Sequence, residues 1–229
     1  MAYYNRPEMV RLALQSIAIQ SHTDWELAFV DDGSDIAGAP IVTEILSSHL
    51  DKVKFYSTGH SAEQKNIQGG SIFGNLWNVA MYHTEAEIGI MLCDDDALYP
   101  DYLKNLSEYY SLYPEVIYSY GHISIFDPKH FKDIANVPTN MQANTNHVGT
   151  INPYCNVDAS QVSWRIKPVT EAMIKFLSPK TTDLDAGFYN LLYNSYQGCV
   201  FNGIIAQYKG WHDDQMGWRT HNMYDVKDR

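Results

Sequence analysis

The sequence predicts an α/β fold with a mostly parallel central sheet flanked by helices. Over the first 56 residues, short apolar runs alternate with stretches of helical spacing in the order strand, helix, strand, helix, strand. That alternation is typical of parallel strands joined by right-handed crossovers. Farther on, an apolar run at residues 88–93 stops at three consecutive acids, Asp94, Asp95 and Asp96. We interpret this run as a central parallel strand buried on both faces, with the acids at its carboxyl end.

The expected elements of the first half follow from local patterns. Residues 1–4 supply a short first strand, and Pro7 suits the first turn of a helix that continues to residue 20. Residues 25–30 form a second strand that ends at Asp31 and Asp32, just before a Gly-Ser turn. The chain then continues with a helix from residue 40, a strand at 53–56, a long loop at 58–75 and a helix around residues 77–81.

The second half is expected to be more irregular. Residues 116–120 and 123–126 have the composition of two strands in a hairpin or meander. Residues 127–152 are polar and rich in Asn, so we interpret them either as an ordinary surface loop or as an insertion or lid beside the site. The other expected elements are helices from residue 100, at 168–177 and at 185–195, a strand at 199–206 and a polar tail at 211–229.

Composition excludes several classes of function. The formal net charge of -11 disfavours a nucleic-acid-binding protein, because such proteins need a basic surface to neutralise phosphates. The three cysteines, Cys93, Cys155 and Cys199, lack the spacing of a zinc site or a disulfide framework. No apolar stretch is long enough to span a membrane and no signal peptide is visible, so we expect a cytoplasmic protein, compatible with peripheral contact at a membrane.

Acidic residues follow two of the predicted strands. Because parallel strands present their carboxyl ends at one edge of a sheet, we expect Asp31, Asp32 and the acids at 94–96 to line one crevice. Adjacent carboxylates repel one another unless a cation or proton compensates them, and oxygen ligands suit Mg²⁺ or Mn²⁺. The alternative is a solvated acidic turn before Pro100.

Several motifs in a fixed order resemble those of a known family. They are Tyr4-Asn5-Arg6-Pro7, then Val30-Asp31-Asp32-Gly33-Ser34, and then the acidic run followed by Pro100-Asp101. Together they resemble the family 2 glycosyltransferases, which have the GT-A fold. The resemblance implies one GT-A domain, with a nucleotide-sugar-binding α/β region at residues 1–126 and a smaller acceptor-binding and catalytic-base region at 127–229.

The resemblance also implies roles for residues of the donor side. Tyr4 and Asp32 match positions that contact the nucleotide base, Asp31 is the neighbouring candidate, and Asp94 matches the acid near the ribose. Arg6 belongs to the same donor-side motif. The metal ligand is Asp95 if counted back from Pro100 and Asp96 on a plain Asp-x-Asp reading, so both remain candidates. The family often has an Arg-Asn pair where Trp77-Asn78 stands, so Asn78 remains a donor-site candidate. Lys65 or Arg165 would replace the missing arginine as the basic residue that reaches the diphosphate.

On the acceptor side, residues 156–161 resemble the segment that lines the acceptor pocket, and a simple turn is the alternative. Asp185 resembles the catalytic base that opens a helix, with Asp183 as its rival, although helix capping explains either acid without chemistry. His212 follows an aromatic and basic pair, as does a histidine near the metal and diphosphate in relatives. A surface histidine is the alternative.

The function implied is that of an inverting, metal-dependent glycosyltransferase. It would use Mn²⁺ or Mg²⁺ to move a sugar from a nucleotide diphosphate sugar, a uridine diphosphate sugar being favoured, to a hydroxyl acceptor such as a glycan. Two alternatives stay open. One is a non-catalytic or truncated relative that binds a nucleotide or glycan. The other is a sugar nucleotidyltransferase, which would carry a basic, Gly-rich phosphate loop near the first strand that is not visible here. The oligomeric state is not set by the sequence.

Overall fold

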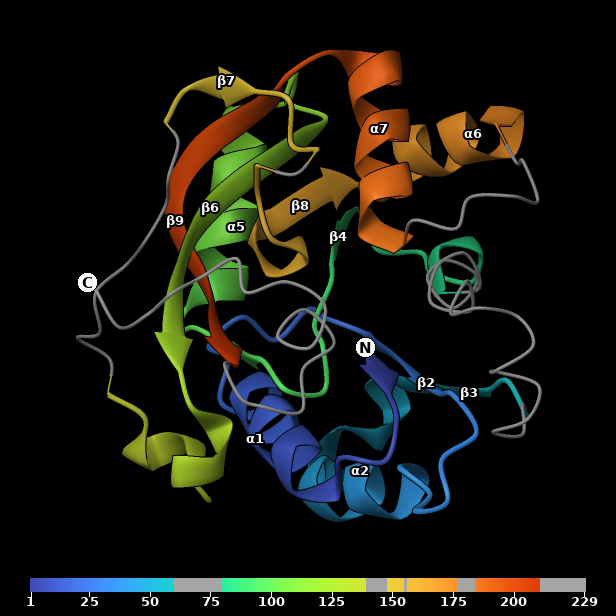
Figure 1. Cartoon of the computed structure of the whole chain (residues 1–229), viewed down its shortest axis with the longest axis vertical. Coiled ribbons are helices and arrows are strands. Elements are labelled where there is room, and N and C mark those ends of the chain that lie inside the picture. The colour runs from blue at the N-terminus through green and yellow to red at the C-terminus, as the bar shows by residue number, and fades with distance from the viewer. Residues whose placement is uncertain (60–79, 139–147, 155, 177–183, 211–229) are drawn as a thin grey trace.

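A computed structural model of the chain describes residues 1–59, 80–138, 148–154, 156–176 and 184–210. Within these ranges the chain forms two sheets with helices at both ends of the molecule (Figure 1). Helices α1 (Pro7–Ala18) and α2 (Ala39–Ile45) lie beside the first sheet, whereas α6 (Ile166–Phe176) and α7 (Leu184–Tyr196) lie at the opposite end, next to the second (Figure 1).

The first sheet contains three parallel strands in the order β1-β2-β3. They are β1 (Ala2–Tyr3), β2 (Leu27–Asp31) and β3 (Val53–Ser57), and a 3-10 turn at Ser47–Lys52 links α2 to β3. Helix α1 begins at Pro7, whose fixed φ suits a first turn, and its buried Val10, Leu14 and Ile17 belong to the same core cluster as Phe29 of β2. The predicted strand-helix alternation of the first 57 residues is therefore confirmed.

The second sheet has six strands in the order β4-β8-β6-β9-β5, and β7 pairs with β9. Helix α5 (Tyr102–Leu112) packs against β9. All the described pairings of this sheet are antiparallel except that of β6 with β9. The strands are β4 (Ile88–Ile90), β5 (Ala97–Leu98), β6 (Tyr118–Phe126), β7 (Thr150–Ile151), β8 (Val162–Arg165) and β9 (Cys199–Gly210).

The prediction that the acid-ended run is a central parallel strand buried on both faces is wrong. Strand β4 is half-buried, ends at Ile90 and pairs antiparallel with β8, which the sequence reading did not identify. Gly89 permits this pairing, since a Cβ there would lie 2.8 Å from the indole of Trp164 on β8. Among the described residues, this segment pairs in parallel with the first sheet at a single bridge, between Cys93 and Ala2 of β1. A mostly parallel arrangement thus describes the first sheet, and the second is mixed.

The prediction of two separate strands at residues 116–120 and 123–126, in a hairpin or meander, is also wrong, because β6 is one continuous strand, Tyr118–Phe126. Gly121 marks a close approach of two backbones. A Cβ at Gly121 would collide with the carbonyl oxygen of Ile204 on β9, and the register with β9 shifts between Tyr120 and His122. A glycine inside a strand is typical of such irregularities.

Three short 3-10 turns complete the described elements, at Pro128–His130, Ile134–Asn136 and Ala159–Gln161. The predicted loop at 58–75, the start of the helix at 77–81 and the tail at 211–229 lie largely or wholly outside the described residues, although residues 80–82 are helical. Among the helices that are described, none is long and apolar enough to cross a membrane.

Candidate functional site

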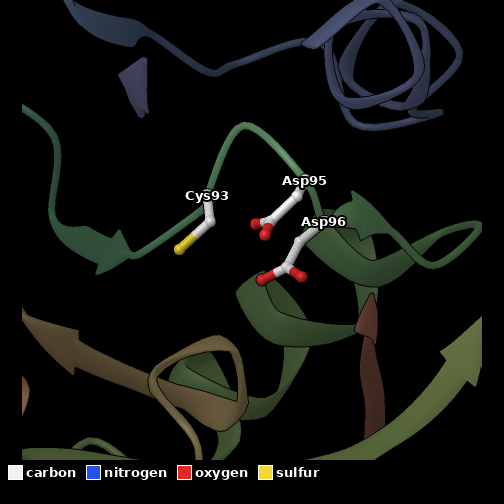
Figure 2. Close-up of side chains that lie close together, drawn as sticks. All are labelled: Cys93, Asp95 and Asp96. Carbon is white, nitrogen blue, oxygen red and sulfur yellow. The ribbon is translucent and has the colours of Figure 1, made fainter. Parts of the chain in front are cut away.

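The acidic residues lie in residues 91–96, which connect β4 to β5 of the second sheet and pass beside the first sheet. One end of this connection is fixed by the Ala2–Cys93 bridge to β1. The other end is fixed by β5, which pairs antiparallel with β9 through Ala97 and Tyr208. Asp94, Asp95 and Asp96 are all buried, and Figure 2 shows the side chains of Asp95 and Asp96 close to that of Cys93. Because all three acids are buried, the alternative interpretation of this segment as a solvated acidic turn is wrong.

The carboxyl end of β1 meets this acidic loop directly. The backbone N–H of Tyr4 donates to Asp94 Oδ2 at 3.0 Å. The Arg6 guanidinium donates to Asp94 Oδ1 at 2.9 Å and to Asp95 Oδ2 at 3.1 Å. Tyr4 is 39% exposed, so this aromatic residue is accessible beside the cluster. Three of the predicted donor-site residues, Tyr4, Arg6 and Asp94, therefore lie together.

The two acids after β2 behave differently from each other. Asp31 accepts the backbone N–H of Ser34 and of Gly38, each at 2.9 Å, so its carboxylate shapes the loop that follows β2. Asp32 is buried and accepts the hydroxyl of Thr58 at 2.9 Å. Its own backbone N–H bonds to Tyr3, which keeps it at the end of β1. Asp31 therefore stabilises the loop after β2, whether or not it also contacts a ligand.

Strand β9 supplies the other side of the site. Gly210 N–H donates to Asp96 Oδ1 at 2.8 Å, and the Lys209 ammonium lies 3.3 Å from Asp96 Oδ2 and 3.4 Å from Asp158 Oδ1. Asp158 caps the 3-10 turn Ala159–Gln161 within the predicted acceptor-side segment, accepting the N–H of Ser160 at 3.0 Å. The sequence singled out Lys209 only as part of the pair that precedes His212; a lysine beside the aromatic Tyr208 at the end of a largely apolar strand was an available signal.

The cluster carries more negative charge than its cations offset. Burial raises the pKa of Asp94 to about 6 in spite of Arg6, and burial raises the pKa of Asp96 to about 7 in spite of Lys209. Burial opposes the charge of Lys209, but Asp158 and Asp96 outweigh it and raise the pKa of this lysine well above 10.5. The raised pKa of Lys209 shows that negative charge prevails in this cluster, so the site attracts further positive charge.

The donor atoms of this cluster fit a hard divalent cation. Cys93 Sγ and one oxygen each of Asp95 and Asp96 lie within 4.8 Å of one another. Burial raises the pKa of the Cys93 thiol well above 9.0, so the thiol stays protonated and is a poor ligand. Carboxylate oxygens are the ligands that Mg²⁺ and Mn²⁺ prefer, which leaves Asp95 and Asp96 as the residues suited to hold the ion.

Arg165 does not join the site. It pairs with Ile88, at the start of β4, and forms an ion pair with Glu87. Its guanidinium donates to the carbonyl oxygens of Val116 at 3.0 Å and Tyr110 at 2.7 Å. The structure therefore assigns Arg165 to the packing of α5 against β8, and not to a diphosphate.

The remaining predicted site residues are placed in part. Asp185 lies in the first turn of α7, as expected of an acid that opens a helix. Asn78, Asp183, His212 and Lys65 lie outside the described residues.

Comparison with known proteins identifies the family. The family described as "Glycosyl transferase family 2" matches residues 1–156, more than half of the 229-residue chain. The chain belongs to this family. The matched range contains Tyr4, Arg6, both acids after β2 and the whole acidic loop. Protein CgeD of Bacillus subtilis (strain 168) is 25% identical over 113 residues, which are 49% of this chain and 25% of CgeD.

Solved structures confirm the predicted GT-A fold. The S. aureus protein TarS (residues 1–349, in complex with UDP-GlcNAc) superposes with a TM-score of 0.68 at 16% identity, over 93% of this chain and 58% of that one. The mannosyltransferase PcManGT of Pyrobaculum calidifontis, in complex with GDP-Man and Mn²⁺, has a TM-score of 0.59 at 15% identity, over 93% of this chain and 56% of that one. The chain thus spans little more than half of these structures and a quarter of CgeD.

Proposed function

We propose that this chain transfers a sugar from a nucleotide diphosphate sugar to a hydroxyl acceptor, in a metal-dependent reaction that inverts the anomeric centre. The observation that carries the proposal is the junction at Asp94, where the end of β1 and the acidic loop meet through Tyr4 and Arg6. A nucleotide bound across this edge would have the accessible Tyr4 on one side and the acids on the other. Membership of the glycosyltransferase family supports the same assignment.

The donor is proposed to be a uridine diphosphate sugar. TarS, with bound UDP or UDP-GlcNAc, has TM-scores of 0.66 and 0.68, whereas PcManGT, with GDP-Man, has 0.59. Asp32 and Tyr4 are the proposed contacts of the base, and Asp94 is the proposed contact of the ribose. Residues 1–126 would then form the donor side, and residues 127–229 the acceptor side with the catalytic base.

Asp95 and Asp96 would hold Mn²⁺ or Mg²⁺. When bound, such an ion offsets the negative charge that the diphosphate leaving group gains as the glycosidic bond breaks. Arg6 holds Asp94 and Asp95 in place, and Gly210 N–H fixes one oxygen of Asp96. Burial of all three acids excludes water from this part of the site and strengthens these interactions.

Asp185 is proposed to accept the proton of the acceptor hydroxyl. A hydroxyl is a poor nucleophile at neutral pH, and a carboxylate within about 2.6–3.2 Å can remove its proton as the new bond forms. Attack on the face opposite the diphosphate inverts the anomeric centre. Asp185 stands in the first turn of α7, with Asp183 as the alternative base.

The proposal is tested by titrating the purified protein with UDP, GDP and ADP, each with and without Mn²⁺, and measuring the melting temperature. A ligand at 100 times its dissociation constant stabilises the native state by about 2.7 kcal/mol. For a chain of this size, that is a rise of about 5–11 °C. We expect the rise with UDP and Mn²⁺ together. Folded protein that shows no rise with any nucleotide would refute the donor site.

Transfer itself is tested by UDP release from UDP-sugars in the presence of candidate acceptors. Asp185→Asn should retain the UDP-dependent rise in melting temperature but lose transfer. A wild-type protein that binds UDP with Mn²⁺, yet releases none with any sugar and acceptor tried, would favour the non-catalytic relative.

A further inference from the structure

Lys209 connects the two halves of the candidate site. Its ammonium lies 3.3 Å from Asp96 Oδ2, in the proposed metal site, and 3.4 Å from Asp158 Oδ1, on the acceptor-side turn. The Lys209 side chain is only 16% exposed, and that of Asp96 is fully buried. Bulk water therefore cannot replace the partner of either group. Each charge is stabilised by the opposite charges that the fold places beside it.

Both oxygens of Asp96 are engaged in this arrangement. Gly210 N–H occupies Oδ1, and the Lys209 ammonium faces Oδ2. A divalent ion that binds Asp96 thus meets a positive charge on the oxygen that the backbone leaves open. Two cations on one carboxylate oxygen in a buried site repel each other strongly.

Asp158 offers a place for the displaced charge. Its carboxylate already accepts from Ser160 N–H at 3.0 Å and from the Ser160 hydroxyl at 2.6 Å. The turn that it caps is anchored by Gln161, whose side chain bonds the backbone of Asp158 at 2.8 Å and that of Gly121 at 2.7 Å. Burial opposes ionisation of Asp158, but Lys209 and Ser160 outweigh it and lower its pKa.

We propose that Lys209 is the resident counter-ion of Asp96, that a divalent ion displaces it toward Asp158, and that it thereby links metal occupancy to the acceptor-side turn. Lys209 is a positioning residue in this scheme, since it acts through Asp96 and Asp158. The inference rests on the proposed metal site, and its test therefore measures metal affinity and not turnover.

The test is calorimetric titration of the nucleotide-free protein with Mn²⁺. Lys209→Met removes the competing charge and should tighten Mn²⁺ binding by about 10-fold. Asp158→Asn should weaken Mn²⁺ binding by about 3- to 10-fold, because the ammonium is then held by Asp96 alone. Asn retains the capping oxygen for Ser160, so this variant removes charge and keeps the turn. Lys54→Met serves as the matched control, because Lys54 pairs with Glu26 on the first sheet.

A double variant isolates the link between the two residues. The effect of Asp158→Asn should shrink at least threefold in a Lys209→Met background, since the ammonium that it redirects is gone. Circular dichroism establishes that each variant is folded; if Lys209→Met is not, the direction of the Asp158→Asn effect decides alone.

The outcomes separate this inference from the proposed function. Unchanged or weaker Mn²⁺ binding by folded Lys209→Met, or unchanged binding by Asp158→Asn, overturns the counter-ion assignment while leaving the metal site intact. A wild-type protein that binds no Mn²⁺, with or without UDP, overturns the metal site and the inference together.

Discussion

Replacing Asp96 by Asn should stabilise the metal-free protein at pH 8, although it removes a residue that we place in the metal site. Asp96 is buried, with Asp95 and Asp158 near it, and burial raises its pKa from the ordinary value of 3.8 to about 7. Between these values the folded protein binds more protons than the unfolded chain. Its stability therefore falls as the pH rises from about 4 to about 7, and ionised Asp96 is a net cost above that window.

The size of the effect follows from the pKa. A difference of about 3 pKa units, at about 1.36 kcal/mol per unit, gives a cost of about 4 kcal/mol at pH 8. This cost already includes the attraction of Lys209, and the Asn amide differs from a protonated carboxyl in its hydrogen bonding, so we expect a net gain of about 1–3 kcal/mol in the free energy of unfolding. At pH 4.5, Asp96 is protonated in the folded wild type, and the advantage of the variant should shrink by about 3 kcal/mol.

The assay is urea unfolding of both proteins at pH 8 and pH 4.5 with a chelator present. Asp51→Asn is the control, because it also replaces a carboxylate by an amide but at an exposed position. The reasoning is refuted if the stability difference between Asp96→Asn and wild type stays the same at both pH values. Added Mn²⁺ and UDP should stabilise the wild type but not the variant.

Three further changes test other parts of the structure. Gly210→Ala should cost about 1–3 kcal/mol of stability in urea unfolding, because its Cβ would collide with the carbonyl oxygen of Asp95; a neutral result would contradict the close approach of β9 to the acidic loop. Arg165→Lys should cost about 1–3 kcal/mol, since a lysine cannot reproduce the guanidinium bonds to backbone carbonyls, while UDP affinity measured by calorimetry stays unchanged. Asp185→Asn should lower transfer at least about 100-fold in a UDP-release assay, and a matching loss in Asp183→Asn alone would move the base to that residue.

The parallel half of the fold could be predicted because its signals are local. Strands β1, β2 and β3 are each followed or preceded by a helix with a clear apolar stripe, and Pro7 marks where the first helix begins. Strand β8 was missed because it has four residues and runs directly into α6, so it carries no turn signal. Strand β9 was predicted too short because Gln207 and Lys209 are polar residues whose partners lie far away in the sequence.

The contact between Arg6 and Asp94 could be expected from the sequence, whereas the contacts of Lys209 could not. Arg6 and Asp94 come from motifs with characteristic order, and the structure brings them to 2.9 Å. The contact of Lys209 with Asp96 and Asp158 depends on the pairing of Ala97 with Tyr208, which spans more than a hundred residues. Neither hydrophobic periodicity nor spacing encodes such a pairing, because it is decided by how the two sheets meet.

The meeting of the two sheets also explains why the acidic run is not a central strand. Four carboxylates face two cations: Arg6 bonds Asp94 and Asp95, and Lys209 lies between Asp96 and Asp158. Arg6 follows the first sheet and Lys209 belongs to the second, so a regular strand through residues 91–96 would satisfy only one of them. Because β4 ends at Ile90, residues 91–96 pass beside the first sheet before the chain rejoins the second sheet in β5, and neighbouring acids meet cations from both sheets. With all four carboxylates ionised, two negative charges remain unpaired, which is the charge that one divalent ion neutralises.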